Sequence, residues 1–219
     1  MKRVGVILAG CGVLDGSEIH EAVLTLLYLD RDGADVQCFA PDKPQMHVVN
    51  HLTKQPVDGE TRNVLVEAAR IARGQIKPLS ELRMEDIDAV IIPGGFGAAK
   101  NLCTYATQGV ECEIDSDMKQ VIQEAVAQGK VVGAICISPV VVAKALQEKG
   151  LHPKLTIGTD PGTNQDLADL GAEAIDQAVN EIIVDETLRI VTTPAYMLGP
   201  SISHVALGIK KLVDKVLEL

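Results

Sequence analysis

The sequence contains no tryptophan, and aromatic residues make up only 2 % of it. Few rings are therefore present to stack on nucleic-acid bases. Hydrophobic residues still reach 47 %, so Val, Ile, Leu and Ala must build the interior. A core of small, branched side chains is typical of a mostly parallel sheet that is covered by helices.

Basic residues are also in deficit, because 20 Lys and Arg stand against 30 Asp and Glu and leave a net charge of −10. An acidic surface repels phosphate backbones, and we therefore expect no binding of nucleic acid. No apolar run approaches the roughly 18 residues that cross a membrane, and the run at residues 3–9 is typical of a first strand rather than a signal peptide. We expect a cytoplasmic protein that does not associate with membranes.

Cysteine pairs of the C-x-x-C type are missing, and the number of cysteines is odd. This spacing indicates neither a disulfide framework nor a zinc site, and reduced thiols are the default in a cytoplasm. The five cysteines are Cys11, Cys38, Cys103, Cys112 and Cys136.

Nucleotide-binding motifs are incomplete as well. Gly10 and Gly12 resemble the start of a dinucleotide fingerprint, but Asp15 occupies the position of its third glycine. The glycine-rich stretch at residues 91–101 lacks the G-K-[ST] of a P-loop. We therefore expect no nucleotide, and we expect neither a metal nor another organic cofactor.

Strand and helix signals alternate along the chain, with no linker that would divide residues 1–219 into two domains. The order predicts a single α/β domain, a three-layer sandwich whose mostly parallel sheet carries a late β-hairpin around Asp185 and Glu186. The parallel strands should place any site at their carboxyl ends. The expected strands are residues 3–9, 34–40, 88–92, 130–135, 180–184 and 188–193, and the expected helices are residues 17–32, 61–73, 116–128, 137–149 and 200–217.

The stretch AICIS, residues 134–138, joins a buried strand directly to a helix. A nucleophile elbow needs small residues two positions before and after the nucleophile, and Ala134 and Ser138 satisfy that need around Cys136. The helix that follows would lower the pKa of the Cys136 thiol through its N-terminal N–H groups and its dipole. The alternative is a small core cysteine without chemistry.

A second stretch, IIPGGFGAAKN at residues 91–101, is a strand followed by a turn that is dense in glycine. Gly94 and Gly95 would let backbone N–H groups face a ligand oxygen, as an oxyanion hole requires. A phosphate cradle and a plain turn between a strand and a helix are the alternatives.

The helix expected at residues 17–32 is apolar nearly all round, and its narrow polar strip holds Glu18, Glu21 and Thr25. A carboxylate in such surroundings should have a raised pKa and could hold or move a proton. The alternative is a capping role for both glutamates, with Asp15 or Ser17 as the N-cap residue. No histidine follows Cys136, so the usual base of a cysteine hydrolase is missing.

Together these stretches resemble the ThiJ/PfpI superfamily, whose members are related to the class I glutamine amidotransferases. Within it the chain is most similar to the glyoxalase-like, ElbB-type branch that has been linked to isoprenoid biosynthesis. The segments that carry the resemblance span the chain and include GCGVLDGSEIHEAVLTLL, CFAPDK, NHLT, TRNVLVEAARIARG, PGGFGAAKNL, TIGTD and IVTTPAYML.

The resemblance implies a flavodoxin-like, class I glutamine amidotransferase-like fold with a reactive cysteine, here Cys136. It also implies that Glu21 contacts this cysteine, with Glu18 one turn earlier on the same side. The oxyanion donors would be the N–H groups of Gly95 and Ile137. A homodimer is implied too, which the helix bearing Glu21 and the loop at residues 42–59 would support.

The chain departs from the wider superfamily at two places. Ile137 stands where the protease and chaperone branches carry a histidine, and TTPAYMLGP stands where glutaminase domains carry His-x-Glu. Both departures disfavour peptidase and glutaminase activity. What remains is the Cys and Glu pair of the glutathione-independent glyoxalases.

The leading hypothesis is therefore a glyoxalase III-type lyase that converts a small reactive dicarbonyl, glyoxal or methylglyoxal, to a 2-hydroxy acid such as glycolate through a hemithioacetal on Cys136. The first alternative is a redox-sensing or regulatory interaction protein in which Cys11 is the candidate resolving thiol. The second is an amidotransferase-like subunit that delivers ammonia to a partner.

Overall fold

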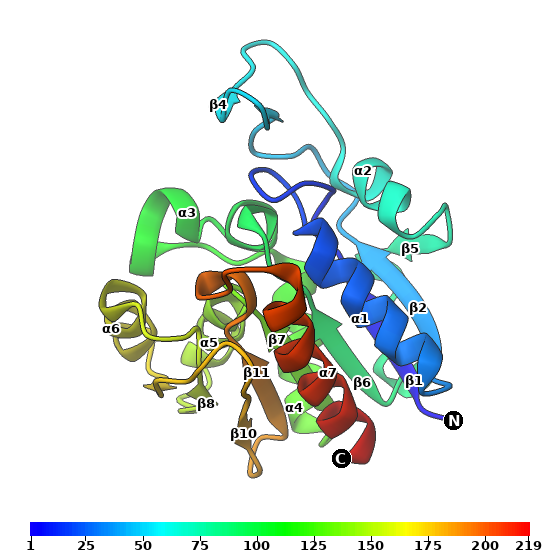
Figure 1. Cartoon of the computed structure of the whole chain (residues 1–219), viewed down its shortest axis with the longest axis vertical. Helices are drawn as coiled ribbons and strands as arrows, with labels where there is room; N and C mark the ends of the chain where they lie inside the picture. Colours follow the sequence, from blue (N-terminus) through cyan, green and yellow to red (C-terminus); the bar gives the residue numbers. More distant parts are fainter.

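A seven-stranded sheet forms the centre of the computed structural model, which describes residues 1–219 in full (Figure 1). Its strand order is β10-β11-β7-β6-β1-β2-β5, and every neighbouring pair is parallel except β10 and β11. The late β-hairpin is therefore confirmed. The strands are β1 (Arg3–Ile7), β2 (Asp35–Ala40), β5 (Ile76–Pro78), β6 (Ala89–Ile92), β7 (Val131–Ile135), β10 (Ile183–Asp185) and β11 (Ile190–Thr193).

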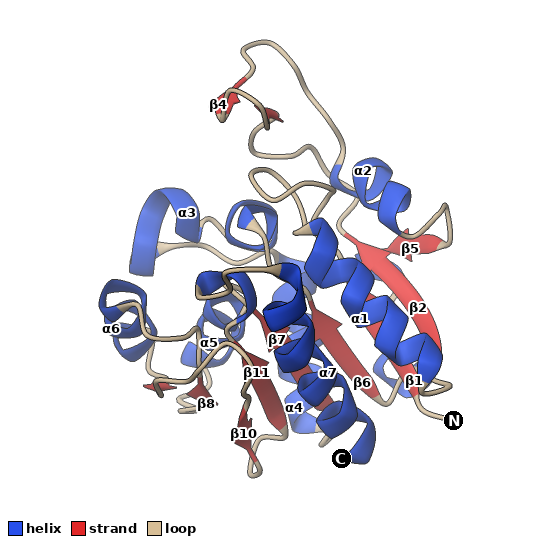
Figure 2. Ribbon diagram, in the orientation of Figure 1, coloured by secondary structure: helices blue, strands red, loops and turns tan.

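Helices cover both faces of this sheet (Figure 2). One buried cluster contains β1 residues such as Val4 and Val6 together with α1 (Ile19–Arg31), α2 (Val64–Ile71) and α7 (Ile202–Glu218). The opposite cluster contains Val132 and Ala134 of β7 together with α4 (Ser116–Ala127), α5 (Pro139–Gln147) and α6 (Pro161–Asp169). Because side chains alternate along each strand, both faces are apolar, and the predicted three-layer α/β sandwich is confirmed.

Several short elements carry no periodic signal in the sequence and were not predicted. A two-stranded hairpin, β3 (Val49–Asn50) with β4 (Gln55–Pro56), lies within the expected loop and projects beyond the carboxyl ends of the strands (Figure 1). The others are β8 (Lys154–Leu155), β9 (Glu173–Ala174), α3 (Tyr105–Gln108), the π-helix η3 (Ala98–Leu102), and the 3₁₀ turns η1 (Leu79–Glu81), η2 (Met84–Asp86), η4 (Gly109–Glu111) and η5 (Ala195–Met197). The edge strand β5 and the helix α6 were not predicted either. None of the helices combines the length and the apolar character that a bilayer crossing requires.

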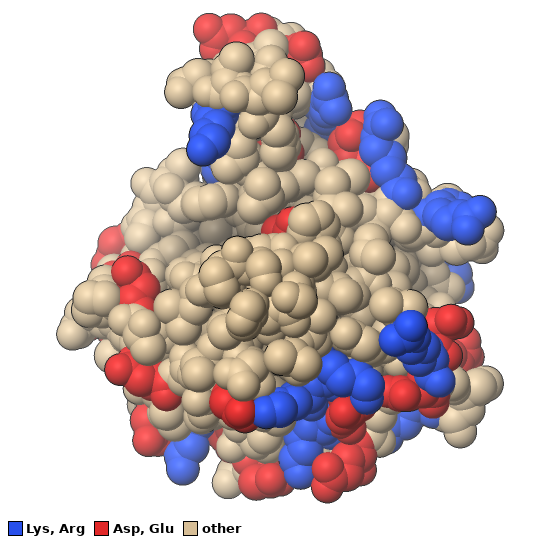
Figure 3. All heavy atoms as spheres, viewed as in Figure 1, with Lys and Arg blue, Asp and Glu red and all other residues tan.

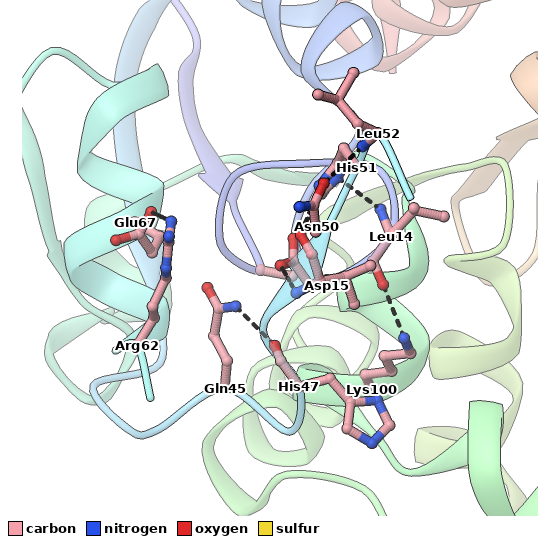
Figure 4. A network of polar contacts seen from close by, with 12 residues as sticks. Leu14, Asp15, Gln45, His47, Asn50, His51, Leu52, Arg62, Glu67 and Lys100 are labelled. Carbon is pink, nitrogen blue, oxygen red and sulfur yellow. Dashed lines mark hydrogen bonds and ion pairs between the residues drawn. The ribbon is translucent and has the colours of Figure 1, made fainter. Parts of the chain in front are cut away.

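The start of α1 corrects one expectation, because the N-cap residue is Glu18 and neither Asp15 nor Ser17 caps the helix. The Ser17 hydroxyl instead accepts the Ala9 N–H at 2.8 Å. Asp15 accepts the Val49 N–H at 2.7 Å and so attaches the projecting hairpin to the turn after β1 (Figure 4). Both side chains serve tertiary contacts that the local sequence does not reveal.

The same region is closed by two further contacts that Figure 4 shows. His51 Nε2 lies 3.8 Å from Asp15 Oδ1 and accepts the Leu14 N–H at 3.2 Å. The Lys100 ammonium donates to the Leu14 carbonyl at 2.8 Å. The hairpin, the turn after β1 and the π-helix η3 are therefore joined at the sheet edge where the site lies.

Candidate active site

Cys136 follows the last residue of β7 and has a φ of 62°, in the left-handed region that is costly for a residue with a side chain. Its N–H donates to the Thr193 carbonyl of β11 at 3.0 Å. Ser138 Oγ donates to the Pro93 carbonyl at 2.9 Å, which ties the start of α5 to the neighbouring glycine turn. The thiol is thus held on a sharp, strained elbow at the carboxyl ends of three strands.

Gly94 explains why glycine is required opposite this elbow. A Cβ on Gly94 would lie 2.4 Å from the Cys136 Cβ and 2.6 Å from a Glu21 carboxylate oxygen. Neither distance is compatible with a real side chain, so the bare backbone allows the thiol and the carboxyl to approach each other.

Glu21 lies on α1 and is fully buried. Its carboxyl accepts the Gly94 N–H at 2.9 Å and the Tyr196 N–H at 3.2 Å, and it also forms a hydrogen bond with the Cys136 thiol. Residues from three distant parts of the chain therefore hold this carboxyl against the sulfur.

Glu18 has a different place from Glu21. Its carboxylate caps α1 by accepting the Glu21 N–H at 2.7 Å, and its own N–H donates to the Gly94 carbonyl at 2.9 Å. The capping alternative is thus correct for Glu18, which acts on the site through its charge and through the position it gives Glu21.

Burial is the main reason that the pKa of Glu21 rises to about 8, and the nearby Glu18 charge adds to the shift. The N–H groups of Tyr196 and Gly94 and the Cys136 thiol oppose the rise, because they favour the carboxylate. The site therefore holds a carboxyl group that keeps its proton at neutral pH.

The pKa of the Cys136 thiol is raised well above its ordinary value, which contradicts the expectation of a lowered one. Burial is the largest cause, and the Glu21 charge follows it. The N–H groups of Gly95 and Ile137 do favour the thiolate, as anticipated, but they are outweighed. The local strand-to-helix motif predicts these donors, whereas the burial depends on packing that it does not contain.

Gly95 and Ile137 both direct their N–H groups at the sulfur of Cys136. Gly95 has a φ of +95°, and a Cβ there would lie 2.4 Å from the Glu18 nitrogen. The two donors converge on the sulfur from separate turns, so they favour a negative charge at this position.

The sequence reasoning missed two residues at the edge of this site. Tyr196, on η5, supplies a backbone N–H to Glu21, and its hydroxyl forms a hydrogen bond of 2.8 Å with Nδ1 of His20. The His20 and Tyr196 rings lie 5.8 Å apart. Tyr196 falls within one of the segments that carry the family resemblance, which is the only signal that marked it.

Cys11 lies in different surroundings from Cys136. The charges that act on its thiol are those of Glu67, Arg70 and Asp15, and burial raises its pKa. No hydrogen bond joins Cys11 to Cys136, and neither thiol is among the groups that act on the pKa of the other. No group of three or more His, Cys, Asp or Glu side chains is arranged to hold a metal ion.

The surface near the carboxyl ends of the strands is hollowed below the projecting hairpin (Figure 3). Lys and Arg side chains stay at the margins of this face, and its centre shows no basic side chain and one small group of Asp or Glu atoms beside the hollow (Figure 3). Such a surface suits a small, uncharged ligand better than an anionic one.

Comparison with curated proteins gives relatives over almost the whole chain. The human glutamine amidotransferase-like class 1 domain-containing protein 3, mitochondrial, is 47 % identical over 222 residues, which cover 99 % of this chain and 83 % of that protein. The ES1 protein homolog, mitochondrial, of Rattus norvegicus is 45 % identical over 99 % of this chain and 84 % of its own length. Both names give a mitochondrial location, which does not fit the expectation of a cytoplasmic one.

Solved structures share the fold. The isoprenoid biosynthesis protein with amidotransferase-like domain from Ehrlichia chaffeensis is 39 % identical, with a TM-score of 0.91 and coverage of 99 % of both chains. Drosophila melanogaster DJ-1beta, at 20 % identity and a TM-score of 0.54 over 99 % of this chain and 94 % of its own, shares the fold alone. The model of the DJ-1/PfpI family matches residues 9–198. With this match and the relatives above, the chain belongs to the DJ-1/PfpI family, which is also called ThiJ/PfpI.

Proposed function

We propose that this protein is a cysteine-dependent, glyoxalase III-type lyase that converts glyoxal or methylglyoxal to glycolate or lactate without a cofactor. The observation that carries the proposal is the contact between the Cys136 thiol on its strained elbow and the buried Glu21 carboxyl. A nucleophile and a group that can move a proton are what this isomerisation needs.

In the first step the Cys136 sulfur, as thiolate, attacks one aldehyde carbon of the dicarbonyl. The new C–S bond moves the carbonyl electron pair onto oxygen, and the N–H groups of Gly95 and Ile137 stabilise that oxyanion. The protonated Glu21 carboxyl then gives its proton to the oxygen, which completes the hemithioacetal and leaves Glu21 as a carboxylate.

In the second step the Glu21 carboxylate removes the proton from the carbon that bears the sulfur, forming an enediolate. Glu21 returns this proton to the neighbouring carbon, and the proton of the sulfur-side hydroxyl passes to the neighbouring oxygen, which gives a thioester of the 2-hydroxy acid. Water then cleaves the C–S bond and restores the Cys136 thiol, so that the net change is addition of one water molecule to the dicarbonyl. The N–H groups of Gly94 and Tyr196 donate to the Glu21 carboxyl oxygens and hold them in position for this proton transfer.

A raised thiol pKa supports a second candidate, a redox-sensing or regulatory protein with weak catalysis. Burial and the Glu21 charge disfavour the thiolate that the first step needs, so the attack would be slow at neutral pH. The Ehrlichia relative is called an isoprenoid biosynthesis protein, and a regulatory role of this chain would belong to the same area of metabolism. A kcat/KM for glyoxal far below about 10⁴ M⁻¹s⁻¹ would favour this candidate over the lyase.

Ammonia delivery as an amidotransferase-like subunit has weaker support. No histidine is among the groups that act on the Cys136 thiol, although a glutamine-hydrolysing cysteine needs a base.

We also propose a homodimer, whose interface would include the outer face of α1.

The test of the lyase is glyoxal consumption with glycolate as the measured product. Cys136→Ala should reduce turnover by at least about 10³-fold, because the covalent step is lost. Cys38→Ser is the control, since Cys38 is a buried cysteine on β2 and its pKa is shifted by burial alone, with no contribution from Glu21 or Cys136. Turnover that survives in Cys136→Ala would sink the mechanism, and loss in both variants would point to misfolding.

A further inference from the structure

Two cysteines outside the site form a pair that the proposed reaction does not use. Cys103 follows the π-helix η3, and Cys112 follows the turn η4. Their relative exposures are only 3 % and 2 %, and their thiols share a hydrogen bond. Both remain free thiols, so the structure holds a reduced, buried dithiol.

The backbone between them brings the two side chains to one face. Cys103 is bridged to Ile114 in an antiparallel pair, and the Thr104 N–H donates to the Glu113 carbonyl at 2.9 Å. The Glu113 N–H in turn donates to Thr104 Oγ at 2.8 Å. Because side chains alternate along a strand, Cys112 points to the same face as Ile114 and lies diagonally across from Cys103.

The electrostatic surroundings give the two thiols different roles. The pKa of Cys112 is lowered to about 7, first by the hydrogen bond from Cys103 and then, against its burial, by the Lys144 ammonium of α5. The same hydrogen bond, together with burial, raises the pKa of Cys103, although Lys43 opposes the rise. Glu111 is the nearby acid and works against the Cys112 thiolate. Cys112 is therefore the nucleophile of the pair, and Cys103 is the proton-bearing partner.

We propose that Cys103 and Cys112 are an oxidation site that hydrogen peroxide converts to an internal disulfide. The Cys112 thiolate attacks one peroxide oxygen, the O–O bond breaks, and hydroxide leaves to give a sulfenic acid. The Cys103 sulfur then attacks the Cys112 sulfur, the S–O bond breaks, and the lost oxygen and the Cys103 proton leave as water. One peroxide is reduced to two waters in total, and two thiols are oxidised to one disulfide.

The two cysteines lie in a short loop segment, which is where peroxide could reach them without unfolding of the sheet. Cys112 lies between the exposed residues Glu111 and Glu113, in a segment whose helical structure is limited to the four-residue α3 and the three-residue 3₁₀ turn η4. A small shift of this segment would admit a molecule as small as peroxide. The Cys103 sulfur also lies 3.5 Å from the Ala98 carbonyl oxygen of η3, and formation of the disulfide would alter that contact.

Tryptic digestion makes the test direct, because Lys100 and Lys119 bracket one peptide that contains both cysteines and no other Lys or Arg. The whole protein is treated with peroxide, denatured, alkylated and digested. Peptide 101–119 should lose two hydrogen atoms and both alkylation sites, and dithiothreitol should restore them. Full alkylation of this peptide, under peroxide that already oxidises Cys136 in peptide 131–144, would overturn the proposal.

Variants test the assigned order of events. In Cys103→Ser the Cys112 sulfenic acid should persist and react with dimedone, at least about tenfold more than Cys38 does in the same sample. In Cys112→Ser, Cys103 should stay fully alkylated, because it lacks the thiolate character needed for the first step. Equal oxidation of the remaining thiol in both variants would contradict these roles. Cys38→Ser should form the disulfide as the unaltered protein does.

Discussion

At the scale of single residues, the chemistry depends on two acidic groups that share one buried space. Glu21 and Cys136 each lose their proton with more difficulty because the other is near and because water is excluded. When the pair gives up one proton, the lower pKa of Glu21 places most of the negative charge on its carboxylate, and the N–H groups of Gly95 and Ile137 support the minor form with the charge on sulfur. The reactive form is thus a thiolate beside a neutral carboxyl.

The pH dependence of turnover follows from that form. Because the pair must lose one proton before sulfur can attack, kcat/KM for glyoxal should rise with pH through about 8, the pKa of Glu21. Glu21→Gln should reduce turnover by about 10²-fold or more, since the amide cannot move the carbon-bound proton. Steady-state assays between pH 6 and 10 measure both effects. Normal turnover in Glu21→Gln would show that the proton-transfer role is wrong.

At the scale of elements, two turns that are far apart in the sequence place the donors of the site. The turn after β6 supplies Gly95 and the turn after β7 supplies Ile137, and the parallel pairing of Ile92 with Ala134 brings them side by side. The glycine turn also packs against the start of α1, where the Glu18 N–H donates to the Gly94 carbonyl. A change in this turn should therefore disturb the donor and the proton carrier together.

Gly95→Ala tests the glycine turn. The new Cβ would lie 2.4 Å from the Glu18 nitrogen and 2.5 Å from the Gly16 carbonyl, so the turn must shift and misplace the Gly95 N–H. We expect kcat to fall by about 10²-fold or more, as for the loss of one oxyanion donor.

The control is Gly129→Ala, which also has a positive φ, of +65°, but with nothing within 4 Å of the new Cβ. It carries the backbone strain without the clash, so it should lower the unfolding midpoint slightly and leave kcat unchanged. If Gly129→Ala loses as much kcat as Gly95→Ala, strain rather than the donor's position explains the loss.

At the scale of the whole molecule, the buried Glu21 should make stability depend on pH. Its pKa rises from 4.5 in the unfolded chain to about 8 in the folded protein, so the folded state binds this proton more tightly. The stabilisation from proton binding is fully present below about 4.5 and is lost as the pH rises to about 8.

Urea unfolding of the unaltered protein and Glu21→Gln between pH 5 and 9 measures this dependence. The free energy of unfolding of the unaltered protein should fall relative to the variant by more than about 1 kcal/mol over that range. Glu148→Gln is the control, because Glu148 is exposed and its pKa is lowered, so it stays ionised throughout. A constant difference between Glu21→Gln and the unaltered protein would contradict the raised pKa.

The outer face of α1 makes the proposed homodimer testable. Ile19, Val23 and Leu27 recur every fourth residue on this face and are 43 %, 48 % and 37 % exposed. Val23→Asp should shift sedimentation from dimer to monomer, whereas Val66→Asp, at an exposed position on α2, should leave the dimer intact. A monomeric unaltered protein at micromolar concentration would rule out the dimer.

The fold class follows from the sequence alone, because strand and helix periods alternate and continuously apolar strands require cover on both faces. The elbow at Cys136 and the glycine turn at Gly95 were also visible, since local sterics require small residues at those positions. Short elements such as the β3–β4 hairpin were not visible, because contacts such as Asp15 with Val49, rather than periodicity, hold them.

How the site titrates and which side chains meet there depend on the packed fold. The separate roles of Glu18 and Glu21, the backbone donor of Tyr196 and the Cys103–Cys112 dithiol all join segments that are distant along the chain or in loops without periodicity. The helix N-terminus at Cys136 predicted a lowered thiol pKa, yet the fold buries the sulfur beside Glu21 and raises it. Burial is a property of all the layers packed together, so no local motif could show which effect would win.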